Sequence, residues 1–273
     1  MPSGKSSKAV RNARSVVAAT KPKPWGTVAA VLAVVVFASG IFGYLYVRYE
    51  DRVAFTPTAE NQDPSTNIEG VLKVDYPSRG HITAPERVAY DHYPPFGGPH
   101  DAIWAACNGQ VYDQPVRNEN MVHPLEHGAV WIAYNPDQIS GAALESLTDR
   151  VEGQSYIMLS PYPGLDSPIS LQSWGHQLKL KSADDERIDQ FIQSLRINQY
   201  TYPETGASCD TFPGFDPQNP PPFVAEPPGP DATPLDFSAG SGGDPMNGGA
   251  APGGAVPVPG GEPPAPVAPP PGG

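Results

Sequence analysis

The longest apolar stretch of the chain runs from Trp25 to Val47 and contains no charged residue. At 1.5 Å of rise per residue, about 20 such residues cross a hydrocarbon core of roughly 30 Å. Trp25 at one end and Tyr44, Tyr46 and Tyr49 at the other occupy positions typical of the two membrane interfaces. The pattern predicts a transmembrane helix over residues 25–47. A cleaved signal peptide is the alternative, but its apolar core is shorter and is followed by small residues rather than tyrosines.

The charges around this stretch predict its orientation. Residues 1–24 contain six Lys or Arg and no acid, so the positive-inside rule makes them a basic cytoplasmic segment. Everything after the helix is then extracytoplasmic, and we expect the protein in the plasma membrane with its C-terminal part exported. Residues 48–70 are polar and are interpreted as a stalk.

Apolar periodicity over residues 71–215 predicts one exported α+β domain of short strands and two main helices. Strands are expected at Val130–Tyr134, 155–159, 169–174 and 177–180, and helices at 137–152 and 182–197. Beyond residue 215 the composition shifts to proline and glycine, and from Ser238 onward almost every residue is Gly, Pro, Ala or Val. Such a segment buries too little apolar area to offset chain entropy, so residues 216–273 are predicted to form a disordered tail.

Composition excludes one class of partner and sets the redox context of the two cysteines. A formal net charge of −12 argues against nucleic acid, which binds basic faces. Cys107 and Cys209 are the only cysteines, and both follow the predicted membrane helix. An oxidising compartment favours a disulfide between them. A metal-binding thiolate at Cys107, close to several histidines, is the alternative.

The six histidines all lie between residues 81 and 176 and form the main candidate chemistry. His92 and His100 bracket a Pro/Gly loop, and His123 and His127 lie four residues apart, the spacing of one helical turn. Neutral imidazole is a common metal ligand, and the thioether of Met121 would suit copper. These four histidines, with Met121 as an auxiliary ligand, are therefore candidates for a copper or zinc site. Equally, buried histidines can serve as structural residues that hold loops in place.

The letters His123-x-x-Glu126-His127 also match the inverted zincin pattern, in which the glutamate polarises water. That motif needs a sustained helix, whereas Pro124 and Gly128 leave room for one turn at most. We therefore interpret the match as accidental. If Glu126 is buried near His123 and His127, it is a candidate for orienting an imidazole. The alternative is a carboxylate on a helical turn that faces water. The usual nucleophile-elbow and phosphate-loop motifs do not occur in the sequence, so no catalytic residue is assigned.

Two strings carry a family resemblance. They are His92–His100, followed by the segment Cys107–Asp113, and Val122–Tyr134. Together they are similar to the domain of unknown function 3105 family, over roughly residues 80–210. The resemblance implies an actinobacterial single-pass anchor, an exported domain, and histidines that belong to the family pattern.

These features leave three functional hypotheses in order. The first is a non-enzymatic envelope protein that binds a partner, as an accessory subunit of a membrane complex. The second is an extracytoplasmic domain that binds copper or zinc through the histidines. The third is a metallohydrolase.

Overall fold

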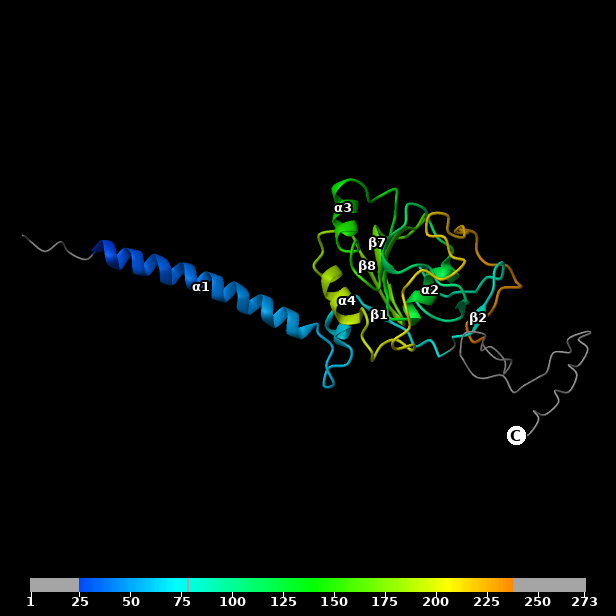
Figure 1. The fold of residues 1–273 in the computed structure, drawn as a ribbon, viewed down its shortest axis with the longest axis horizontal. Helices are drawn as coiled ribbons and strands as arrows, with labels where there is room; N and C mark the ends of the chain where they lie inside the picture. The colour runs from blue at the N-terminus through cyan, green and yellow to red at the C-terminus, as the bar shows by residue number, and fades with distance from the viewer. Residues whose placement is uncertain (1–24, 78, 238–273) are drawn as a thin grey trace, which may run out of the picture. The chain divides into compact units, whose positions relative to one another are not determined.

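The computed structural model describes residues 25–77 and 79–237; the predicted basic segment and residues 238–273 of the predicted tail lie outside this part. The elements run, in chain order, α1 (Trp25–Ala54), η1 (Pro64–Asn67), β1 (Leu72–Lys73), β2 (His81–Ile82), β3 (His100–Asp101), β4 (Asn108–Val111), α2 (Asn118–Glu126), β5 (Val130–Tyr134), α3 (Ala142–Asp149), β6 (Ile157–Pro161), β7 (Ile169–Ser173), β8 (His176–Leu180) and α4 (Arg187–Leu195) (Figure 1).

The chain divides into two compact units between Val53 and Ala54. Helix α1 has 30 residues and is, among the described elements, the one long and apolar enough to cross a membrane. It continues seven residues beyond the predicted end at Val47. The extra residues had been assigned to the stalk because charges begin at Arg48.

The second unit is built on a six-stranded mixed sheet in the order β1-β8-β7-β5-β6-β4. Strand β5 pairs in parallel with β6, through a connection that contains α3, and antiparallel with β7. Strands β7 and β8 form an antiparallel hairpin, with the turn at Trp174 and Gly175. Helices and a mixed sheet in one unit confirm the predicted α+β class.

The two faces of the sheet cover different cores, as the alternation along β5 shows. Val130, Ile132 and Tyr134 belong to one hydrophobic cluster, whereas Trp131 and Ala133 belong to the other. Successive strand residues point to opposite faces, so a fully apolar strand must be buried on both sides. Helices α3 and α4 cover the first face, and α2 with long loops covers the second (Figure 1). His100 lies on this loop-rich second side, where its ring packs against Trp174 of the second core and against His123 of α2.

The ordered domain extends past the predicted boundary at residue 215 and reaches Phe237. Phe223, Leu235 and Phe237 pack against the second core, and a parallel β-bridge joins Val88 to Thr233. The sequence does not predict these three packing contacts, because the proline content of the segment is typical of a disordered tail. Residues 216–237 are therefore part of the domain.

A partly buried carboxylate connects the segment after α1 to the sheet. Asp63 accepts hydrogen bonds from Ser65 Oγ, Lys73 Nζ and His176 Nε2, the last at 3.2 Å. Burial raises the pKa of Asp63, but the hydrogen bonds from His176, Lys73 and Ser65 outweigh it and hold that pKa well below its usual range. The ionised form is thus favoured by folding.

Replacing Asp63 by asparagine should lower the free energy of unfolding by about 1.5–3 kcal/mol at pH 7, because hydrogen bonds to a charged group are lost. The unfolded chain protonates Asp63 near pH 4, whereas the folded chain does so only at lower pH, so this contribution is present above about pH 4 and is lost as the pH falls. Thermal unfolding from pH 3 to 7 measures it.

The matched control is Asp166→Asn, which removes an exposed pair with Lys179 and should change stability by less than about 1 kcal/mol. A constant deficit of the Asp63→Asn protein across the whole pH range would contradict the assigned role of the charge.

Candidate metal centre

Helix α2 places the side chains of His123 and Glu126 on one of its faces. It spans Asn118–Glu126 and contains Pro124 in its last turn. Proline cannot donate to the carbonyl of Asn120, four residues earlier, but that carbonyl accepts the N–H of Ala105 at 2.9 Å instead. The helix therefore starts well before His123 and continues through Pro124, which corrects the expectation of one turn at most. His123 and Glu126, three residues apart, share a face.

Two further histidines are placed by a short parallel strand pair. Strands β2 and β3 align His81 directly with His100 in register. Their imidazole rings lie 4.9 Å apart, and each also lies within 4.9 Å of the ring of His123. Segments that are distant in sequence thus bring three imidazoles together.

These three histidines and Glu126 form a compact donor set, called the His₃Glu cluster below. One donor atom from each of the four residues lies within 4.8 Å of every other. A tetrahedral ion with ligands about 2.1 Å away has donor–donor distances of about 3.4 Å, so shifts of about 1 Å would close the set around one ion. His100, His123 and Glu126 are buried, and the side chain of His81 is 10% exposed.

Backbone carbonyls fix which nitrogen of two imidazoles is available. Nδ1 of His100 lies 2.9 Å from the carbonyl oxygen of Gly98, and Nδ1 of His123 lies 2.6 Å from that of Asp101. A carbonyl can only accept, so each Nδ1 carries a hydrogen, and in the neutral form of the ring Nε2 carries the lone pair. Histidines that ligate metals characteristically make such a bond through their other nitrogen.

The charge of the cluster comes from Glu126, whose side chain is 2% exposed. Its Oε2 lies 2.9 Å from Nε2 of His100, yet the alignment is not that of a hydrogen bond, and neither atom has a hydrogen-bond partner among the described residues. Its Oε1 lies 3.7 Å from the guanidinium of Arg79. Buried polar atoms without partners are costly, and a cation between them would satisfy both.

The protonation state of His123 suits a ligand. Burial lowers the pKa of His123 well below its usual range, and the neighbouring His100, His127 and His81 lower it further. The ring is therefore neutral at physiological pH, the form that binds metals.

His127 lies beside the cluster, with its ring 4.7 Å from that of His123. Its Nδ1 donates to the carbonyl of Ser208 at 2.7 Å, and its Nε2 lies 3.5 Å from a carboxylate oxygen of Glu204. A hydrogen bond from His127 lowers the pKa of Glu204. Because both ring nitrogens face oxygen acceptors, His127 has no lone pair aimed at the cluster. It supports the cluster from outside.

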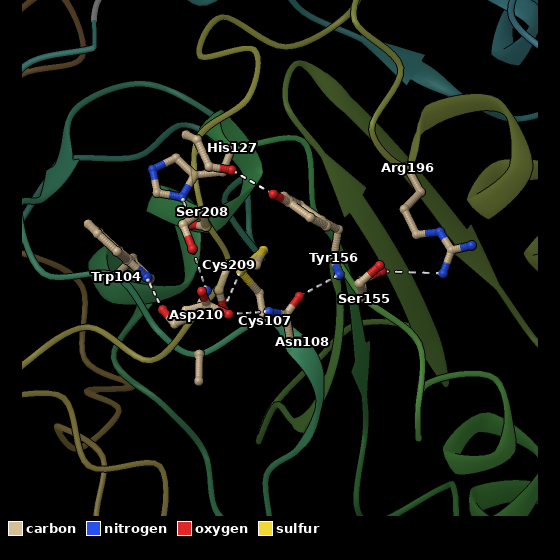
Figure 2. Close-up of a disulfide and its surroundings, with 12 residues drawn as sticks. Trp104, Cys107, Asn108, His127, Ser155, Tyr156, Arg196, Ser208, Cys209 and Asp210 are labelled. Carbon is tan, nitrogen blue, oxygen red and sulfur yellow. Dashed lines mark hydrogen bonds between the residues drawn. A yellow bond between two sulfur atoms is a disulfide. The ribbon is translucent and has the colours of Figure 1, made fainter.

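The disulfide holds a segment that contacts His127 and Trp104 (Figure 2). Cys107 is bonded to Cys209. The carbonyl of the preceding Ser208 accepts from His127, and the carbonyl of the following Asp210 accepts the indole N–H of Trp104 at 2.8 Å. The Trp104 ring lies 5.3 Å from that of His123. The disulfide thus helps to position the side chains of Trp104 and His127, whose rings both lie against the ring of His123.

The residues predicted from the sequence are only partly brought together. Of these residues, the cluster contains His100, His123 and Glu126. His92 lies elsewhere: its Nδ1 is 2.9 Å from Asp91, and its ring packs against Phe96. Met121 is fully buried in the second core. Two residues along a helix correspond to a rotation of about 200°, which directs Met121 away from the face of His123.

His81 is not among the metal ligands that the sequence predicts. Cys107 is predicted there as an alternative, a metal-binding thiolate. His81 has no neighbour at a ligand-like spacing, and only its pairing with His100 places it in the cluster. Cys107 is in the disulfide, and no free cysteine is present among the described residues, so the thiolate alternative is not supported.

Comparison with known proteins identifies the domain. Residues 81–211 match the model of a family described as "Protein of unknown function (DUF3105)". This range contains the whole His₃Glu cluster and both cysteines. Searches among curated proteins and among solved structures found no match. Residues 81–211 therefore form a domain of the DUF3105 family.

Proposed function

We propose that this protein is a membrane-anchored, extracytoplasmic metal-binding protein whose ligands are His81, His100, His123 and Glu126. The observation that carries the proposal is the buried His₃Glu cluster, in which three imidazoles and one carboxylate converge. The sequence alone favours a partner-binding accessory subunit. Because these four side chains converge, we place metal binding ahead of partner binding. An envelope or membrane protein partner remains a prediction.

The donor set favours a borderline divalent ion, with zinc ahead of copper. Imidazole suits zinc, copper, iron and nickel, whereas the carboxylate is a hard donor, and the thioether of Met121 that would favour copper lies in the core. Four protein donors complete a tetrahedral shell, as in structural zinc sites, while hydrolytic sites keep a position open for water. A bound ion would join β2, β3 and α2, so we propose a structural or carrier role rather than hydrolysis.

The location of the domain is part of the proposal. The apolar helix α1 supports a membrane anchor, and the Cys107–Cys209 disulfide supports an oxidising compartment for the second unit. With the basic residues before α1, these features support a cytoplasmic N-terminus and an extracytoplasmic domain in the plasma membrane.

Zinc titration in competition with a chromophoric chelator tests the ligand set, using the full chain in detergent without a histidine tag. Structural zinc sites bind with about 10–16 kcal/mol, so each of four ligands accounts for about 3 kcal/mol, or roughly 100-fold in affinity. His81→Ala should therefore weaken zinc binding roughly 100-fold. His92→Ala is the matched control and should leave the affinity within about twofold. Equal losses in both variants, or a loss only in His92→Ala, would contradict the proposed ligands.

A further inference from the structure

A second feature, independent of the metal centre, is a cleft of about 700 Å³ after helix α4. Its walls include one proline, three tyrosines, one arginine and one isoleucine, namely Pro57, Tyr156, Tyr200, Tyr202, Arg196 and Ile197. The polar side chains of Asn198, Gln199 and Thr205 complete the lining, so the cleft offers aromatic and polar contacts together. Tyr200 is 41% exposed and Ile197 is 51% exposed, so their side chains add little to the domain core.

Two residues of this cleft hold the backbone in a left-handed conformation. Ile197 has a φ of 49° and Tyr156 has a φ of 56°, and they are the only non-glycine residues with positive φ in the described part of the chain. For a β-branched side chain this conformation costs of order 1–3 kcal/mol, and such strain clusters at functional sites. A glycine at position 197 would remove the strain. The isoleucine instead presents an apolar side chain to solvent at the mouth of the cleft.

The cleft also contains a cation without an acidic partner. Arg196 donates to Gln154 Oε1 and to the carbonyl of Ser155, each at 3.3 Å (Figure 2). Both acceptors are neutral, and no carboxylate lies within 4.0 Å of its guanidinium among residues 25–77 and 79–237. Burial lowers the pKa of Arg196. A guanidinium in this setting favours an anionic ligand, which it can bind through two parallel hydrogen bonds.

Tyrosines around a shallow cleft are the surface that proline-rich peptides recognise, because the polyproline II helix loses little entropy on binding. The chain itself contains such a peptide in Glu262–Pro271, where a single acid precedes a run with six prolines, two alanines and one valine. Residues 238–273 contain no Lys or Arg, so their charge complements Arg196. We propose that the cleft binds Glu262–Pro271 of the same chain, with Glu262 against Arg196 and the prolines on the tyrosines.

The chain is long enough for this contact. From Phe237 to Glu262 there are 25 residues, and a chain of that length can span at most about 85 Å. A folded domain of the size of residues 54–237 has a radius of gyration of about 16 Å. The peptide therefore reaches any point on the surface of its own domain.

Site-specific photo-crosslinking on the full chain in lipid nanodiscs tests the proposal. The photoreactive residue p-benzoylphenylalanine replaces Tyr200, and mass spectrometry maps the crosslinked residues after irradiation. We expect the main adduct within residues 262–271 of the same molecule. The same residue in place of Tyr93, which is 40% exposed and lies outside this cleft, is the matched control and should give at least tenfold less of that adduct.

Two substitutions test the charge complementarity. Arg196→Gln and Glu262→Gln should each reduce the adduct from position 200 several-fold, and Arg196→Lys should retain part of it. Adducts to a second copy of the chain, to copurified glycan, or to residues 238–261 would each overturn the proposed contact. Equal yields from positions 200 and 93 would overturn it as well.

Discussion

His123→Ala should abolish zinc uptake at micromolar zinc and should remove the thermal stabilisation that we expect zinc to give the wild-type protein. The expected effect is larger than for His81→Ala, because His123 is the centre of the cluster. Its ring contacts those of His81, His100 and His127. The neighbouring ring of His127 is held by the carbonyl of Ser208, so we do not expect it to replace the lost ligand.

The readout is thermal unfolding with and without zinc. At a free zinc concentration about 100 times Kd, binding stabilises the folded state by about 2.7 kcal/mol, which raises Tm by roughly 5–10 °C in a domain of this size. The wild-type protein should show this rise and His123→Ala should not. Circular dichroism of the zinc-free variant separates a lost ligand from a lost fold. A folded His123→Ala protein with an undiminished zinc-induced rise in Tm would contradict the ligand assignment.

Replacing both Cys107 and Cys209 by serine has the second largest expected effect, on stability and on metal affinity together. The two residues are 102 positions apart, and closing a loop of about 100 residues contributes about 4.7 kcal/mol on the chain-entropy model. This is a large share of the roughly 5–15 kcal/mol that stabilises a typical domain. We expect Tm to fall by more than about 10 °C.

Metal affinity should fall as well, because the disulfide fixes the segment that contacts His127 and Trp104. Loss of groups that support metal ligands typically costs 10–100-fold in affinity. Zinc titration at 10 °C, where the variant remains folded, measures this effect. His92→Ala, with its disulfide intact, serves again as the control. A variant that loses stability but binds zinc as tightly as the wild type would show that the segment held by the disulfide does not position the ligands.

The sequence predicts the regular half of this domain well and the loop-rich half poorly. The apolar run Val130–Tyr134 coincides with β5, since five consecutive apolar residues suit a strand buried on both faces. The sequence does not predict helix α2, because Pro124 interrupts the helical pattern. In addition, Asn118, Glu119 and Asn120 are polar residues of the kind usually exposed to solvent. In the structure all three are buried, and Ala105 satisfies the carbonyl that Pro124 leaves free.

The candidate site could be predicted only in part, for a related reason. The sequence predicts His100 and His123 as ligands. It also pairs His92 with His100 because they bracket a Pro/Gly loop, whereas that loop directs the two rings to different neighbours. The partner of His100 is His81, and no local rule reveals a pairing between two-residue strands separated by a proline-rich loop. The closeness of Glu126 to His100 cannot be predicted either, because the pairing of β2 with β3 places His100 beside it. The sequence therefore predicts only an orienting role for Glu126.

Metal content of the purified protein tests the central claim most directly. The full chain is expressed into an oxidising compartment without a histidine tag, dialysed against metal-free buffer and analysed by inductively coupled plasma mass spectrometry. The His₃Glu cluster predicts close to one equivalent of zinc per chain, lost in His123→Ala and retained in His92→Ala. No bound metal in the wild-type protein, together with no gain in Tm on adding zinc or copper, would contradict the metal-binding function and leave the histidines with a structural role.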